Sequence, residues 1–412
     1  MKKRKICVMG LGYIGLPTSA LLANFGYEVH GVDIEQNIVD IINSGKIHIS
    51  EPDLDTFVKA AVNSGKLKAD IKPAEADVFI IAVPTPFRCD NPEIKIPTPN
   101  IDYVMNATKS IAPYLRESNI VILESTSPIG TTRKVQELLA SERPDLFDQQ
   151  NKQSKIFIAH CPERVLPGKI MRELVENDRI VGGVTLEATK IVADFYREFV
   201  QGEVFETDDM TAEATKLAEN SYRDINIAFA NELSMLCDKF GINVWELIKL
   251  ANRHPRVNIL NPGCGVGGHC IAVDPWFLVY SGGELAKLIK TAREVNNYKT
   301  EWVIEKIMNT VLNFEKEHLR KAKVACMGIT FKPDVDDLRE SPALFITKRL
   351  MASNVDVVVA EPNIKEYKDF KIYDYREAIE IADIVVFLVA HKEFKNLKIT
   401  KKVLDFCGVT IR

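Results

Sequence analysis

The chain has 412 residues and a formal net charge of −4 at pH 7, with 46% apolar and 27% charged residues. Its length suits two or three domains that each bury a core, and its mild acidity argues against general nucleic-acid affinity. No apolar run approaches the 18 residues of a membrane span. The eight cysteines are too sparse for a disulfide scaffold and lack zinc-site spacing, so we expect a cytoplasmic protein with reduced thiols and no metal.

The first half of the chain alternates short apolar, β-rich runs with helical stretches. The predicted strands cover residues 5–9, 27–32, 76–83, 119–124 and 155–159. Apolar strands separated by helices indicate a parallel sheet that is covered on both faces. We therefore predict a doubly wound α/β domain, a Rossmann-like domain, over residues 1–206.

Residues 207–317 are predicted to be helical. The run 211–240 contains no glycine or proline, and alanine and leucine recur at helical spacing. Further helical runs cover residues 244–253 and 284–314, after a loop rich in glycine and proline over 255–275. Long helices between two α/β units often form a subunit contact, so we expect a helical dimerisation domain.

Residues 318–412 return to the α/β pattern. Strands are predicted at residues 323–328, 355–359, 384–389 and 403–406, with a helix over 342–353. The predicted fold is therefore α/β, with two Rossmann-like doubly wound domains joined by an all-helical central domain.

A glycine-rich turn follows the first predicted strand and opens a helix. Its members are Gly10, Gly12, Tyr13, Ile14 and Gly15. Between a strand and a helix, such glycines permit a tight turn and a close approach to a pyrophosphate. Asp33, at the end of the second strand, can bind a ribose 2′-hydroxyl, and no arginine follows to favour a 2′-phosphate. The pattern predicts NAD as the cofactor in preference to FAD or NADP.

Two threonines follow the next two strands of the first domain. Thr85 lies in Val83-Pro-Thr-Pro86, and Thr126 follows Glu124 and Ser125. Ligands bind at the carboxyl ends of strands in open α/β sheets, so both are candidate cofactor contacts. The alternative is that each caps the following helix.

The segment 263–270, Gly-Cys-Gly-Val-Gly-Gly-His-Cys, is the most unusual in the chain. Its glycines indicate a flexible, close-approach loop whose backbone N–H groups can bind anions or sugars. Cys270 closes the loop and Asp274 lies four residues further on. A cysteine in this setting can act as a nucleophile, and the alternative is a small buried thiol, the interpretation we give to the other seven. His269 is adjacent to Cys270, and adjacent side chains rarely face one another.

Two further groups could supply acid–base chemistry. Lys216, Asn220 and Arg223 have the spacing of one helix face. This face is either solvated or partly buried, and in the second case Lys216 could stabilise an oxyanion or relay a proton. Glu163 follows the fifth strand and is a candidate general base for a water molecule; the alternative is a helix cap or a surface acid.

Together these segments resemble the UDP-glucose/GDP-mannose dehydrogenase family of UDP-sugar 6-dehydrogenases. The matching segments are residues 10–15, 83–86, 124–126, 162–163, 216–220, 267–270 with Asp274, and 331–332 with 339–341. The stretches 226–233, 252–260 and 265–276 resemble members that oxidise UDP-N-acetyl-D-mannosamine, and Cys264 departs from their pattern. The resemblance implies a homodimer or larger assembly that uses two NAD per UDP-sugar in bacterial surface polysaccharide synthesis, such as that of enterobacterial common antigen or capsule.

The resemblance also implies the chemistry of the site. Cys270 would attack an aldehyde at sugar C6, and the resulting thiohemiacetal would be oxidised to a thioester that water hydrolyses. Lys216 and Asn220 would act on the developing alkoxide, and Asp274 and Glu163 would assist proton transfer. The same chemistry on UDP-N-acetylglucosamine or UDP-glucose stays open, as do a one-step hydroxy-acid dehydrogenase and an NAD-binding scaffold without turnover.

Binding residues follow from the same resemblance. The sugar and diphosphate would be bound by Arg164, Val165, Lys216, Asn220, Arg223, Gly267, Phe331 and Lys332. Arg339 would meet the NAD pyrophosphate, because guanidinium groups suit phosphates. His254 and Arg256 would reach the substrate of the partner subunit.

Overall fold

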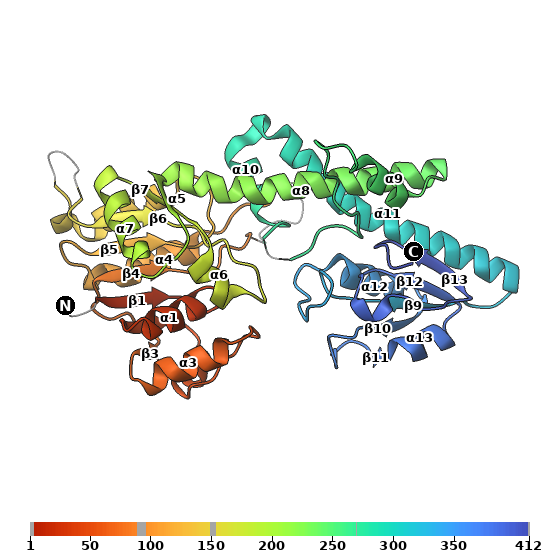
Figure 1. The fold of residues 1–412 in the computed structure, drawn as a ribbon, viewed down its shortest axis with the longest axis horizontal. Helices are drawn as coiled ribbons and strands as arrows, with labels where there is room; N and C mark the ends of the chain where they lie inside the picture. Colours follow the sequence, from red (N-terminus) through yellow and green to blue (C-terminus); the bar gives the residue numbers. More distant parts are fainter. Residues whose placement is uncertain (1–3, 89–95, 149–153, 269, 411–412) are drawn as a thin grey trace. The chain divides into compact units, whose positions relative to one another are not determined.

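The computed structural model describes residues 4–88, 96–148, 154–268 and 270–410 (Figure 1). The chain divides into two compact units, residues 1–218 and 219–412. The long helix α8 (Asp209–Phe240) contributes residues to both units. None of the helices in the described residues combines the length and the apolar character that crossing a bilayer requires.

The first unit contains an eight-stranded sheet in the order β3-β2-β1-β4-β5-β6-β7-β8. The strands are β1 (Lys5–Met9), β2 (Glu28–Val32), β3 (Leu67–Asp70), β4 (Val78–Ile81), β5 (Ile120–Leu123), β6 (Phe157–His160), β7 (Arg179–Gly183) and β8 (Val204–Asp208). All five predicted strands are present. The sequence does not predict β3, β7 and β8, which are short and interrupted by polar or glycine residues, and β7 pairs antiparallel with β6.

Alternating side chains divide the core of this unit into two layers. Ile6 and Val8 of β1 pack on one face of the sheet, and Cys7 and Met9 pack on the other. The first layer contains α1 (Gly15–Asn24), α2 (Gln36–Asn43), α3 (Leu54–Asn63), α6 (Ile170–Glu176) and α7 (Leu186–Arg197); the second contains α4 (Asp102–Ile111) and α5 (Thr131–Glu142). A sheet covered on both faces leaves the carboxyl ends of its parallel strands as the edge where a ligand can bind.

The second unit begins with helices and ends with a parallel sheet (Figure 1). Its helices after α8 are α9 (Val244–Ala251), α10 (Asp274–Gly282), α11 (Lys287–His318), α12 (Pro342–Ala352) and α13 (Tyr375–Ile381). The strand order is β11-β10-β9-β12-β13, with β9 (Lys323–Met327), β10 (Asp356–Ala360), β11 (Ile372–Tyr373), β12 (Ile384–Phe387) and β13 (Lys402–Asp405). Apolar residues of α11 and α12 cover one face of this sheet, and α13 covers the other.

The predicted fold class is confirmed. Rossmann-like sheets lie near both ends of the sequence, and the helices α8 to α11 lie between them in the chain. The sequence does not predict α10, which is short and has a proline in its first turn. The boundaries at residues 206 and 317 stay predictions.

A buried polar network joins α8 to α11. Asp224 accepts hydrogen bonds from Arg293 at 2.6 Å and from Asn296 at 2.8 Å, and Asn231 donates to Asn296 at 2.9 Å. All four side chains are buried. Because removing one partner would leave a charge or a polar group unpaired in the interior, the network favours a single register of the two helices.

Candidate active site

The glycine turn after β1 is shaped by its backbone neighbours. Gly10 has φ +90°, and a Cβ there would lie 2.7 Å from the carbonyl oxygen of Ala82. A Cβ on Gly15 would lie 1.8 Å from the carbonyl oxygen of Gly10, whereas a Cβ on Gly12 would have no neighbour within 4 Å. Gly10 and Gly15 are therefore required by the fold, and Gly12 leaves space in front of the turn.

The groups around this open space are those that a dinucleotide needs. Ile14 is the N-cap of α1 and offers no side-chain cap, so the helix N-terminus can bind a phosphate. Tyr13 packs on the adjacent core layer. The carboxylate of Asp33 accepts from the backbone N–H groups of Leu11 at 3.0 Å and Glu35 at 3.1 Å. The turn, the helix terminus and the carboxylate lie together and fit NAD.

The threonines after β4 and β5 contact one another. The Thr85 hydroxyl donates to the carbonyl oxygen of Thr126 at 2.6 Å, across the ends of two paired strands. Neither residue caps the following helix, because the N-caps of α4 and α5 are Ile101 and Gly130. The capping alternative is therefore wrong, and their role as cofactor contacts stays a prediction.

Glu163 is a buried residue. Its carboxylate accepts from the guanidinium of Arg179 and from the backbone N–H of Arg164, and Glu163 and Arg179 are 7% and 2% exposed. The alternative of a surface acid is therefore wrong. The sequence analysis missed Arg179, because it lies in β7, a strand that the sequence does not predict.

A second carboxylate lies in the same cluster. Glu124 accepts from the hydroxyl of Tyr196 at 2.7 Å, and the Arg179 guanidinium lies 5.4 Å from the centre of the Tyr196 ring. Burial, followed by the neighbouring charge of Glu163, raises the pKa of Glu124 to about 7, against the opposing effect of Arg179. The cluster therefore holds two carboxylates with one guanidinium and favours a protonated Glu124.

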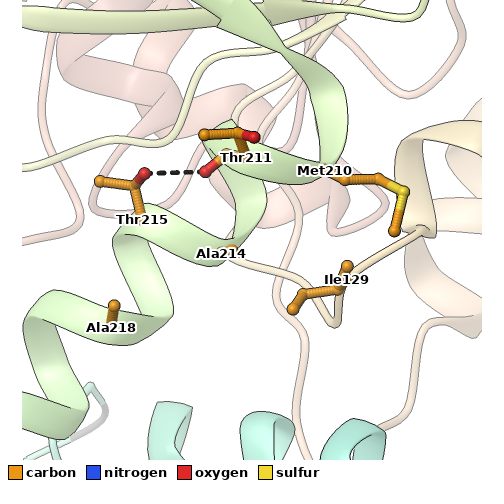
Figure 2. A pocket seen from close by; sticks show the side chains of 6 residues that line it. All are labelled: Ile129, Met210, Thr211, Ala214, Thr215 and Ala218. Atoms are coloured by element: carbon orange, nitrogen blue, oxygen red, sulfur yellow. Dashed lines mark hydrogen bonds between the residues drawn. The ribbon is translucent and has the colours of Figure 1, made fainter.

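A shallow apolar hollow lies beside the first turns of α8 (Figure 2). It is lined by Ile129, Met210, Thr211, Ala214, Thr215 and Ala218. Both of its hydroxyls are engaged, since Thr215 donates to the backbone oxygen of Thr211 and Thr211 donates to Asp208. None of the residues that line the hollow is titratable, and the half-buried Lys216 lies between its lining residues Thr215 and Ala218 on the same helix.

The glycine loop of the second unit, residues 263–268, is anchored. Asn231 accepts from the N–H of Gly263 at 2.9 Å, and Thr300 donates to the carbonyl oxygen of Cys264 at 2.8 Å. A Cβ on Gly265 would lie 2.4 Å from the Thr300 hydroxyl. The close approach expected of this glycine loop is therefore present, because Gly265 packs against α11 and Gly267 packs against Phe331 and the backbone of Glu340.

The nucleophile candidate follows this loop. The carbonyl oxygen of Cys270 accepts from the N–H groups of Val273 at 3.0 Å and Asp274 at 2.8 Å, so the chain turns directly into α10. The buried Asn220 donates to Asp274 at 2.6 Å. The structure therefore brings Cys270, Asp274 and Asn220 together, while His269 lies outside the described residues.

The other described cysteines are unsuited to nucleophilic attack. Cys7, Cys161, Cys264 and Cys326 are buried, and burial raises the pKa of each thiol to about 11 or 12. Burial likewise raises the pKa of the remaining two, Cys237 and Cys407. Cys264 belongs to the glycine loop and its side chain packs in the core of the second unit, and Cys89 lies outside the described residues.

Two predicted binding residues meet at the glycine loop. A Cβ on Gly267 would lie 2.8 Å from the Cβ of Phe331, so the phenylalanine is close to the loop. Lys332 is half-buried beside it. Arg339 forms a bidentate ion pair with Asp337, with Nη2–Oδ2 at 2.6 Å, a partner that the sequence analysis missed.

The remaining predicted binding residues are divided between the two units. Arg223, His254 and Arg256 are exposed, and His254 accepts from the N–H of Arg256 at 3.3 Å. In the first unit, the Arg164 guanidinium donates to the carbonyl oxygen of Asp178, and Val165 packs on the core. Their roles toward a substrate stay predictions.

Three family models match the chain in succession. Residues 4–200 match the NAD binding domain of the UDP-glucose/GDP-mannose dehydrogenase family, 210–298 its central domain and 325–409 its UDP binding domain. The matches cover most of both sheets and most of the helices that lie between them in the chain.

Full-length relatives agree with these models. A UDP-N-acetyl-D-mannosamine dehydrogenase of Campylobacter jejuni is 57% identical over 98% of this chain and 99% of its own. An NDP-N-acetyl-D-galactosaminuronic acid dehydrogenase of Ralstonia nicotianae is 51% identical over 96% of this chain and 92% of its own. The solved UDP-N-acetyl-mannosamine dehydrogenase of Staphylococcus aureus is 43% identical and covers 99% of this chain and 95% of its own, with a TM-score of 0.85.

The second and third glycines of the turn, Gly12 and Gly15, give a matched test of the NAD site. Gly12→Ala should keep the unfolding midpoint but raise the Kd for NADH about tenfold, because its Cβ enters the space of the pyrophosphate. Gly15→Ala should lower the unfolding midpoint as well, because its Cβ meets backbone. NADH fluorescence titration and thermal unfolding measure both, and unchanged NADH affinity in Gly12→Ala would contradict this placement.

The raised pKa of Glu124 predicts a pH-dependent stability. A carboxyl with a raised folded-state pKa contributes stability below its ordinary pKa and loses it as the pH rises through about 7. Glu124→Gln keeps an acceptor for Tyr196 and removes this loss. Its unfolding midpoint should exceed that of the unaltered protein by about 2 °C or more at pH 8, with a smaller gain at pH 5. An equal effect at both pH values in thermal scans would count against this reading.

Proposed function

Because the chain belongs to the UDP-glucose/GDP-mannose dehydrogenase family, we propose that it oxidises the C6 hydroxymethyl group of UDP-N-acetyl-D-mannosamine to a carboxylate in two NAD-dependent steps. The main structural support for this proposal is the position of Cys270. This half-buried cysteine follows an anchored glycine loop and adjoins the Asn220–Asp274 pair. The family assignment supplies the NAD-dependent dehydrogenase chemistry. The names of the Campylobacter and Staphylococcus relatives support the sugar.

The first oxidation converts the alcohol to an aldehyde. NAD, when bound at the glycine turn, accepts the hydride of each oxidation. Lys216 takes up the hydroxyl proton or stabilises the alkoxide that forms. Asn220 supports the oxygen from one helical turn further along α8.

The second oxidation takes place on a covalent adduct. The Cys270 sulfur attacks the aldehyde carbon, and the thiohemiacetal loses a second hydride to become a thioester. Water then cleaves the thioester and releases the carboxylate and the thiol. Asp274 and Glu163 move the protons of this step, and Arg179 orients the Glu163 carboxylate. The covalent bond keeps the reactive aldehyde from leaving between the two oxidations.

The sugar of the UDP-sugar substrate has more than one candidate. The Ralstonia relative, whose name refers to an N-acetyl-D-galactosaminuronic acid, is 51% identical to this chain, so a 2-acetamido sugar of another configuration is the second candidate. UDP-N-acetylglucosamine and UDP-glucose are further candidate substrates for the same two-step oxidation. A panel of these UDP-sugars, compared by kcat/KM, discriminates between them.

The active form is proposed to be a homodimer. Tyr222, Phe229 and Leu236 are exposed and spaced by seven residues on α8, so they form one apolar stripe on that helix. Contiguous exposed apolar side chains mark protein interfaces. His254 and Arg256 are exposed in the segment after α9 and are proposed to act on the substrate of the partner subunit.

The stoichiometry of NADH tests the two-step chemistry. The unaltered enzyme should form two NADH per UDP-sugar consumed, and Cys270→Ser should form no net uronate because the thioester cannot form. NADH absorbance together with chromatography of the product measures both quantities. Cys264→Ser, a buried thiol in the core, is the control and should keep the stoichiometry of two. One NADH per sugar with an active Cys270→Ser enzyme would indicate a one-step dehydrogenase, and no NADH with any sugar would indicate a scaffold.

Mixed dimers test the action of Arg256 in trans. Arg256→Ala and Cys270→Ser should each be nearly inactive alone. Co-expressed in equal amounts, they should regain about a quarter of the unaltered activity, because random pairing leaves one complete site in each mixed dimer. Activity no greater than that of the separate variants would place Arg256 in its own subunit's site or outside the site.

A further inference from the structure

The segment 329–334, which carries Phe331 and Lys332, is held at both ends. At its start, the N–H groups of Ile329 and Thr330 donate to Glu361 at 2.8 and 3.3 Å. At its end, the N–H of Asp334 donates to Nδ1 of His391 at 3.0 Å.

The end of the segment has an unusual backbone conformation. Asp334 adopts φ +59°, in the left-handed region that is uncommon for residues other than glycine. Its carboxylate accepts from the N–H of Lys392 at 3.1 Å. A strained backbone persists only where its surroundings determine it, and here the neighbours are His391 and Lys392.

The hydrogen bonds define the tautomer of His391. A backbone N–H can only donate, so Nδ1 is an acceptor, and it accepts from Asp334 and from the Asn363 amide at 2.9 Å. Nε2 therefore carries the proton and donates to Glu361 at 3.0 Å. The ring is completely buried, so these contacts compete with no bulk water.

Glu361 completes the pair as a carboxylate. Its two oxygens accept from the N–H groups of Ile329, Thr330 and Asn363, from the Asn363 side chain and from His391. Burial opposes ionisation, but the hydrogen bonds from His391 and the backbone hold the pKa of Glu361 below its ordinary value.

Segment 329–334 contacts the glycine loop, residues 263–268, within the same unit. The Phe331 ring lies 3.0 Å from the position of a Cβ on Gly268, and the N–H of Gly268 donates to the carbonyl oxygen of Arg339 at 3.0 Å. Phe331 itself donates its N–H to Asp337 at 3.0 Å. The held segment therefore places Phe331 against Gly268 of the glycine loop.

The hydrogen bonds of this region argue against a metal site. Asp334, His391 and Glu393 place three potential ligand atoms within 4.8 Å of one another, among the described residues. The Nδ1 lone pair already accepts two N–H groups, and Nε2 faces Glu361. Both ring nitrogens of His391 are therefore used to hold the backbone and side chains around it.

We propose that the buried Glu361–His391 pair is a positioning element that sets the affinity for the UDP part of the substrate by holding Phe331 and Lys332 in place. The inference rests on the proposed function, because it takes these two residues as contacts of the substrate. A lysine on a held backbone can meet a diphosphate with little loss of conformational entropy.

The test removes the acceptor that holds Asp334. His391→Leu should raise the Kd for UDP, measured by calorimetry, and the KM for UDP-N-acetyl-D-mannosamine by about tenfold or more, while kcat and the KM for NAD stay within about threefold. His391→Asn offers an oxygen near the place of Nδ1 and should recover most of the affinity. A folded His391→Leu protein with unchanged Kd for UDP would overturn the proposal.

A matched control separates positioning from stability. Asp383 accepts from Arg320 and from the N–H of Lys323 at the opposite end of β9. Asp383→Asn should lower the unfolding midpoint without changing the Kd for UDP; equal losses of UDP affinity in Asp383→Asn and His391→Leu would overturn the proposal.

A second variant covers the case in which His391→Leu does not fold. Glu361→Gln keeps the size of the side chain but replaces one carboxylate oxygen by an amide, so the N–H groups of Ile329, Asn363 and His391 lose one acceptor. It should also weaken UDP binding, and an unchanged Kd for UDP would overturn the proposal. UDP binding requires no turnover, so an enzyme that binds UDP but oxidises none of the sugars would refute the proposed function and leave this test intact.

Discussion

The close packing of the glycine loop is the constraint on which the substrate half of the protein depends. A side chain at Gly265 would meet Thr300, and one at Gly267 would meet the backbone of Glu340 and the side chain of Phe331. The loop can therefore run between the helices and the second sheet only because these positions have no Cβ. Its path delivers Cys270 to the start of α10, beside Asp274. The proposed covalent chemistry follows from this placement of one thiol.

The predicted site residues of each unit are held by a different kind of contact. In the first, paired strand ends hold the glycine turn and Asp33, and a buried ion pair holds Glu163 against Arg179. In the second, polar anchors such as Thr300 hold the glycine loop. These contacts cost conformational entropy at folding, so less remains to be lost when a substrate binds.

The sequence predicts the features whose cause is local. The turn at residues 10–15 and the helix over 211–240 show in spacing alone, and both are present. The antiparallel β7, the Arg179–Glu163 pair and the anchors of the glycine loop depend on residues far apart in the chain, and no local pattern encodes them. The glycines that predict a close-approach loop do pack closely in the folded chain, but composition does not reveal what each glycine packs against.

The most direct test of the central claim is the identity of the sulfur that carries the sugar. Enzyme turning over UDP-N-acetyl-D-mannosamine with NAD is quenched in acid, digested and mapped by mass spectrometry, with Glu163→Gln used to slow hydrolysis of the thioester. A uronyl adduct is expected on Cys270, assigned by fragmentation because Cys264 lies six residues away on the same peptide, and on none of the other cysteines. Turnover with no adduct in either enzyme, or an adduct on Cys264, would contradict it.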